Sequence, residues 1–149
     1  MNPEYVRLER EIRGTLAPLS GYPAQVAVVQ LLKARLPRYT WVGVYLLQDD
    51  ELVLGPFLGK PSPHTHIPIG KGICGAAAAA ASTIIVDDVN ADPRYLPCSL
   101  ETRSEIVVPI MRNGEVIGEI DIDSNEPAAF GDDDRQLLEA VAAQLAPKL

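Results

Sequence analysis

The fold of this chain is decided by one stretch, EIVVPIMRNGEVIGEIDID, which spans residues 105–123. It contains two runs suited to β-strands, Glu105–Met111 and Glu115–Asp123, separated by the dipeptide Asn113-Gly114. Asn-Gly is the preferred pair for a type I′ turn, because both central residues of that turn adopt positive φ. We therefore predict an antiparallel hairpin over this stretch.

The predicted hairpin carries three acidic side chains of interest. Asp121 and Asp123 are two residues apart on a strand, so both point to one face of the sheet. That face is either a solvated edge or a pocket that receives a cation or a proton donor. In a regular hairpin Asp123 faces Ser104, which leaves Glu105 on the opposite side of the sheet. A bulge near Pro109 would return Glu105 to the side of the two aspartates, as would an irregular strand start.

Helical and extended patterns surround the hairpin. The predicted helices are residues 3–14, 22–36 and 74–81, and a last helix that follows Asp132. The third contains six consecutive alanines, which are strong helix formers. The remaining predicted strands are residues 40–48, 52–57, 66–69 and 83–86. This order implies an α+β fold with a mainly antiparallel central sheet flanked by helices. The length of 149 residues and 47% hydrophobic content suit one domain over residues 1–149.

Charge and composition exclude several classes of partner. The net charge is −7 and the isoelectric point is about 4.7, which disfavours nucleic acids and anionic membranes. No apolar stretch approaches the roughly 20 residues that a membrane span needs. The polar N-terminus does not resemble a signal peptide. We therefore expect a cytoplasmic protein, in which thiols stay reduced and a catalytic disulfide is favoured over a structural one.

The chain has two cysteines, Cys74 and Cys98. Cys74 follows two glycines at the expected start of a helix, where the helix dipole and Lys71 would stabilise a thiolate. The alternative is a small residue that packs under the helix. Cys98 lies within Asp87–Arg103, the longest irregular segment, and long loops in compact domains are usually functional. Its alternative is a half-buried loop residue.

Three further groups of side chains admit two interpretations each. Trp41 and Tyr45 share one face of a strand, and they form either part of the core or an aromatic wall for a small ligand. His64 and His66 could join the cysteines in a zinc site. Their spacing fits no common zinc pattern, so we predict no metal and regard them as loop residues near a ligand.

Taken together, the sequence resembles the free methionine-(R)-sulfoxide reductases, enzymes of the GAF fold that reduce the free amino acid rather than protein-bound residues. The resemblance covers roughly residues 20–145. It rests on five motifs, at residues 41–47, 52–60, 67–75, 104–109 and 120–124.

The resemblance implies a role for each candidate residue. Cys98 takes the position of the family's nucleophile, and Cys74 matches a second cysteine. The acids that hold the substrate's ammonium and sulfoxide are matched by Glu105, Asp121 and Asp123, and the aromatic residues of the methyl-sulfoxide pocket by Trp41 and Tyr45. Many members carry a third cysteine about ten residues before Cys74, which is absent here. The resolving role therefore falls to Cys74, as in two-cysteine members, or to an external thiol.

The implied activity is the reduction of free L-methionine-(R)-sulfoxide through a Cys98 sulfenic acid and a Cys74–Cys98 disulfide. The resemblance implies no cofactor, a thioredoxin-like reductant as partner, and a homodimer. The alternative from another class is a non-enzymatic GAF module that binds a small ligand and signals.

Overall fold

The computed structural model describes residues 1–97 and 99–149, and Cys98 lies outside the described residues. The described helices are α1 (Pro3–Leu16), α2 (Gly21–Arg35), α3 (Gly72–Ala80) and α4 (Asp132–Leu145), with short 3-10 segments at Val89–Ala91 and Ala146–Lys148. The described strands are β1 (Trp41–Gln48), β2 (Glu51–Leu58), β3 (His66–Pro68), β4 (Ile84–Val86), β5 (Ser104–Arg112) and β6 (Glu115–Ser124). Within these residues, no helix is long and apolar enough to cross a membrane.

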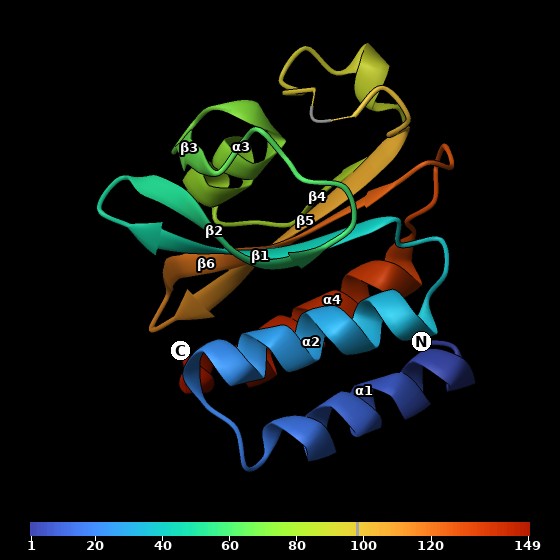
Figure 1. The fold of residues 1–149 in the computed structure, drawn as a ribbon, viewed down its shortest axis with the longest axis vertical. Helices are drawn as coiled ribbons and strands as arrows, with labels where there is room; N and C mark the ends of the chain where they lie inside the picture. Colours follow the sequence, from blue (N-terminus) through green and yellow to red (C-terminus); the bar gives the residue numbers. More distant parts are fainter. Residues whose placement is uncertain (98) are drawn as a thin grey trace.

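The strands form one sheet in the order β3-β2-β1-β6-β5-β4. Every neighbouring pair is antiparallel. Three helices, α1, α2 and α4, lie on one side of this sheet, whereas α3 covers the other side (Figure 1). The predicted α+β fold with a mainly antiparallel sheet is confirmed.

Side-chain alternation along the strands creates two separate apolar layers. On β6, Ile120 and Ile122 pack with the helices α1, α2 and α4, where Leu32 and Leu137 are also fully buried. The opposite layer lies under α3 and is smaller; it contains Trp41, Tyr45, Leu52, Ile67, Ile73, Cys74, Ala77 and Val107. Since Asp121 and Asp123 alternate with Ile120 and Ile122, the two aspartates face the α3 side.

The β5–β6 hairpin closes as predicted but does not keep a regular register. Asn113 and Gly114 both have positive φ, 51° and 79°, as a type I′ turn requires. Met111 pairs with Val116, whereas Ile110 pairs with Gly118, so Ile117 is an extra residue on β6.

This bulge decides which side chains meet in the site. Beyond Ile117, Glu105 pairs with Asp123 and Val107 pairs with Asp121. Residues that pair directly across two strands share a face, so Glu105 lies on the same side as both aspartates. The regular register, with Asp123 opposite Ser104, is therefore wrong. The bulge that returns Glu105 lies on β6 rather than near Pro109.

Helix α3 begins two residues earlier than predicted. Its first residue is Gly72, whose φ of +65° lets the chain turn sharply from the preceding loop into the helix. Cys74 therefore lies in the first helical turn and is buried. Close packing continues at Gly75, where an added Cβ would come within 2.6 Å of the Pro68 carbonyl oxygen.

One buried carboxylate joins the helical layer to the sheet. Asp134 on α4 accepts hydrogen bonds at Oδ1 from Tyr5 (2.9 Å), Tyr39 (2.7 Å) and Arg38 (2.7 Å). Its second oxygen accepts the Gly131 backbone N–H at 2.9 Å. Because these donors come from α1, from the segment before β1 and from the start of α4, Asp134 fixes those parts relative to one another.

Candidate active site

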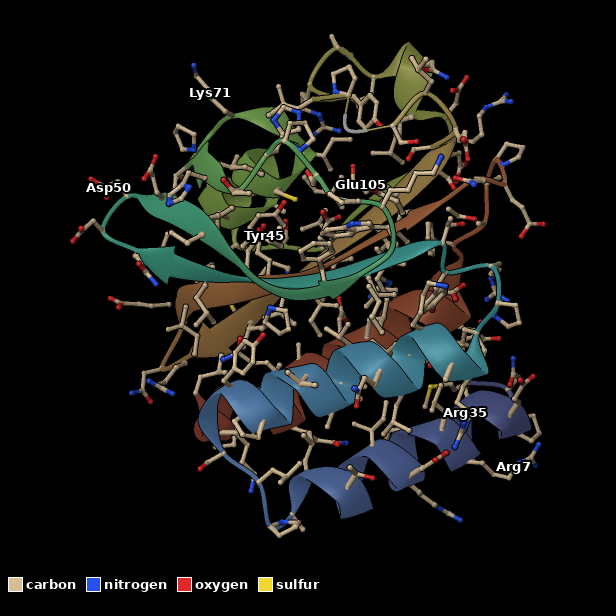
Figure 2. All side chains as sticks on the ribbon, in the orientation of Figure 1. Arg7, Arg35, Tyr45, Asp50, Lys71 and Glu105 are labelled. Carbon is tan, nitrogen blue, oxygen red and sulfur yellow. The ribbon has the colours of Figure 1, made fainter. Side chains whose placement is uncertain are left out.

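A cavity lies between the sheet and α3. It is lined by Trp41, Tyr45, Ser62, His64, Ile67, Gly72, Ile73, Cys74, Tyr95, Leu96, Glu105, Asp121 and Asp123. In Figure 2, the labelled side chains of Tyr45 and Glu105 both lie in the space between the sheet and α3. All the described residues that the sequence proposed as catalytic or substrate-binding line this cavity.

The aromatic wall of the cavity is held in place from several directions. Trp41 stacks on Phe57 with ring centroids 5.7 Å apart, and its indole N–H donates to the Lys60 carbonyl at 2.9 Å. A Cβ at Gly43 would come within 2.4 Å of the indole, so only glycine leaves room for the ring. The Tyr45 hydroxyl donates to the His64 carbonyl at 2.9 Å. Trp41 and Tyr45 thus belong to the α3-side core and also line the cavity.

The acidic residues of the cavity are buried rather than solvated. Glu105, Asp121 and Asp123 are each at most 5% exposed. Burial raises the pKa of Asp121, while hydrogen bonds with Glu105 and Cys74 act in the opposite direction. Desolvation disfavours the ionised form, so this carboxyl holds a proton at higher pH than an exposed aspartic acid. The cavity therefore contains a candidate proton donor.

The Cys74 thiol lies among these acids. Its Sγ donates to Oε2 of Glu105 at 4.0 Å. Burial raises the pKa of this thiol well above its usual value, and the nearby Asp121, Glu105 and Glu119 raise it further. Of the two interpretations of Cys74, burial and the raised pKa therefore favour the small packed residue over the stabilised thiolate. Burial and the nearby carboxyls outweigh the helix dipole. Lys71 is exposed and points away into solvent (Figure 2).

Sequence reasoning missed Glu119, a third acid on the same face of β6. It is fully buried, and neither carboxylate oxygen has a hydrogen-bond partner among the described residues. Burial and the neighbouring Asp121 raise its pKa to about 10. The available signal was spacing, because Glu119 precedes Asp121 by two residues and must share its face.

The histidines do not form a zinc site with Cys74. Among the described residues, the cluster that could hold a metal ion consists of Cys74, Glu105 and Asp121. His64 lines the cavity, but its Nε2 lies 3.0 Å from the Pro97 carbonyl oxygen. His66 is exposed, and its Nδ1 lies 3.2 Å from the Thr65 hydroxyl.

A second and larger pocket adjoins the first. Trp41, Ser62 and Asp123 line both pockets. Its rim includes Lys60 and Glu101, which form an ion pair at 2.6 Å. Ser99 also lines it, immediately after Cys98 in sequence, whereas the predicted nucleophile itself lies outside the described residues.

Comparison with known families and structures shows to which family this fold belongs. Residues 24–149 match the GAF domain family. The fold and the cavity on its sheet thus define a GAF domain.

Individual relatives define the class of protein within the GAF family more closely. The Escherichia coli (strain K12) free methionine-R-sulfoxide reductase is 39% identical over 142 residues, which cover 95% of this chain and 86% of that protein. A Neisseria meningitidis free methionine-R-sulfoxide reductase, solved in complex with its substrate, matches with a TM-score of 0.93 and 35% identity, covering 99% of this chain and 90% of that one. The reduced form of fRMsr of Staphylococcus aureus matches with a TM-score of 0.92 and 36% identity, covering 97% and 94%. The chain therefore belongs, within the GAF family, to the free methionine-R-sulfoxide reductases, which are oxidoreductases.

Proposed function

We propose that this protein reduces free L-methionine-(R)-sulfoxide to methionine, with Cys98 as the nucleophile and Cys74 as the resolving thiol. One observation carries the proposal: a single buried cavity combines a thiol, several carboxyls and an aromatic wall. Relatives that cover most of the chain are named for this activity.

The proposed binding mode follows from the charges in the cavity. A free amino acid carries an ammonium group, and the buried carboxyls provide its counter-charge. Lysine and arginine are absent from the described residues that line the cavity. The methyl-sulfoxide end of the substrate packs against Trp41 and Tyr45. A peptide-bound sulfoxide lacks the free ammonium that pairs with these carboxyls, so it is rejected.

The first chemical step is attack on the sulfoxide sulfur. The Cys98 sulfur first bonds to the sulfoxide sulfur. The oxygen then passes to the Cys98 sulfur as the bonds from the substrate sulfur to oxygen and to Cys98 break, a net two-electron transfer that yields methionine and a Cys98 sulfenic acid. A protonated carboxyl, Asp121 or its neighbour Glu105, donates a proton to the sulfoxide oxygen. Burial raises the pKa of Asp121 and so favours the protonated form that such a donor needs.

The second step resolves the sulfenic acid. The Cys74 thiol must lose its proton to become a nucleophile, and its raised pKa opposes this at neutral pH. The carboxylate created by the first step supplies the base, because the Cys74 Sγ already donates to Glu105. Cys74 then attacks the Cys98 sulfur, which releases water and forms a disulfide.

A thioredoxin-like dithiol reduces that disulfide and completes the cycle. The same proposal includes a reducing cytoplasmic setting, a homodimer, and a single GAF domain over residues 1–149.

The proposal is tested by steady-state turnover with thioredoxin and its NADPH-dependent reductase. We expect turnover of the free (R)-sulfoxide, and little or none of the (S)-epimer or of N-acetyl-methionine sulfoxide. Cys98→Ser should abolish turnover, and Cys74→Ser should stop it after one cycle when thioredoxin is the sole reductant. Undiminished activity of Cys98→Ser would refute the assignment of Cys98 as the nucleophile. A ligand-induced thermal shift without thiol consumption would instead favour the sensor alternative.

A further inference from the structure

Three ligand atoms of the kinds that transition metals prefer converge at the floor of the cavity. They belong to Cys74 on α3, Glu105 on β5 and Asp121 on β6, and all three lie within 4.8 Å of one another. All three residues are buried. Their presence on three different elements means that the fold, rather than a flexible loop, sets their spacing.

The donor set selects among cations. A thiolate with two carboxylates suits Zn²⁺, whereas Ca²⁺ and Mg²⁺ take oxygen ligands only. Tetrahedral zinc, with bonds of about 2.3 Å to sulfur and 2.0 Å to oxygen, separates the two ligand atoms by about 3.5 Å. The Cys74 Sγ and Glu105 Oε2 are 4.0 Å apart. A contraction of about half an ångström would therefore bring this pair of ligand atoms to the separation that zinc requires.

A separate observation concerns buried carboxyl oxygens at and beside this cluster. Within the described residues, Asp121 Oδ1 and both oxygens of Glu119 are buried without a hydrogen-bond partner. Glu119 precedes Asp121 by two residues on β6, so the two side chains share a face of the strand. Buried carboxyl oxygens normally have a partner, because leaving them unpaired is unfavourable. A divalent cation bound to Asp121 would supply one.

We propose that Cys74, Glu105 and Asp121 form an exchangeable Zn²⁺ site, with water as the fourth ligand, and that zinc and substrate exclude each other. The binding part of this proposal is independent of the activity, while the exclusion part rests on the proposed function. Occupancy also removes Cys74 from redox chemistry, so the bound ion inhibits the enzyme. Zinc binding deprotonates the thiol and releases that proton to solvent.

Cobalt titration of the metal-free protein tests the site directly. Co²⁺ bound to a thiolate gives a near-ultraviolet sulfur-to-metal charge-transfer band, and we expect this band to saturate at one ion per chain. Cys74→Ser should remove the band, while Cys98→Ser should retain it. His66→Gln changes an exposed residue outside the cluster and should also retain it. Loss of the band in Cys98→Ser, or its survival in Cys74→Ser, would overturn the assignment.

Zinc affinity and competition complete the test. Calorimetry with Zn²⁺ alone should show a loss of about 100-fold or more in Cys74→Ser and in Asp121→Asn, since even outer-shell changes cost 10–100-fold. Unchanged affinity in both variants would place the ion on the surface and refute the site. Free methionine-(R)-sulfoxide should weaken the apparent zinc affinity in proportion to the sulfoxide concentration. A zinc affinity that does not change with sulfoxide concentration would refute mutual exclusion. Cobalt binding by a protein without reductase activity would refute the proposed function alone.

Discussion

The buried carboxyl of Glu119 makes a quantitative prediction about stability. Its pKa is raised from 4.5 to about 10 in the folded protein, so it is protonated when folded and ionised when unfolded at neutral pH. A carboxyl whose pKa is higher in the folded than in the unfolded state makes its full contribution to the free energy of unfolding below the unfolded-state pKa. That contribution is lost as the pH rises towards the folded-state pKa. Between pH 5.5 and 8.0, at about 1.4 kcal/mol per pH unit, this loss is about 3 kcal/mol.

Glu119→Gln removes the ionisable group but keeps its shape. The stability of this variant relative to the wild type should therefore increase by about 3 kcal/mol from pH 5.5 to pH 8.0. In a domain of this size that corresponds to roughly 6–12 °C in Tm. Urea denaturation at a series of pH values, with a chelator present, measures it.

The matched control is Glu115→Gln, because Glu115 is exposed on the same strand. Its surroundings change little on unfolding, so its stability difference should stay constant within about 0.5 kcal/mol. If the difference between Glu119→Gln and wild type does not grow with pH, the carboxyl is not held neutral in the fold, and the reasoning fails.

Three other predictions concern the site and its support. The raised pKa of the Cys74 thiol should slow its alkylation by iodoacetamide at pH 7.5 relative to the unfolded chain. Mass spectrometry measures this rate, which should fall about tenfold for each unit by which the pKa is raised. Equal alkylation rates in the folded and unfolded chain would show that Cys74 is an accessible thiolate. Asp134→Asn should destabilise the protein by about 3 kcal/mol in urea, because several charge-assisted hydrogen bonds weaken together. The neighbouring change Asp133→Asn, at a position whose side chain is 49% exposed, should change stability by less than about 0.5 kcal/mol. Equal effects of the two substitutions would contradict the role of the buried network. Gly43→Ala should displace the indole of Trp41, which is the only tryptophan of the chain. The displacement should shift the tryptophan fluorescence and lower kcat/KM by up to about 100-fold. An unchanged spectrum and an unchanged kcat/KM would show that Gly43 does not hold the indole in place.

The central hairpin was predictable because its signals are local. Asn113-Gly114 specifies the turn, and alternation along the strand places Asp121 and Asp123 on one face. The position of Glu105 depended on the bulge at Ile117, which no local pattern marks. Since one extra residue reverses the facing of every side chain beyond it, the composition of the site depended on a feature that only the structure reveals.

The sequence could not decide between the two interpretations of Cys74, for a related reason. Its position at a helix start suggested a stabilised thiolate, which is a local argument. The raised pKa instead reflects burial and carboxyls from β5 and β6, which are far away in sequence. Glu119 was overlooked because a glutamate in a strand is normally assigned to solvent. Electrostatic effects inside a cavity depend on tertiary neighbours, so such pKa values require the fold.

The central claim is that Cys98 and Cys74 act together on a free sulfoxide. The most direct test is a single-turnover reaction of fully reduced protein with free L-methionine-(R)-sulfoxide and no external thiol, quenched with an alkylating reagent and mapped by peptide mass spectrometry. The account predicts one methionine per chain and a Cys74–Cys98 disulfide in equal amount. Methionine formed while Cys74 remains a free, alkylated thiol would contradict it.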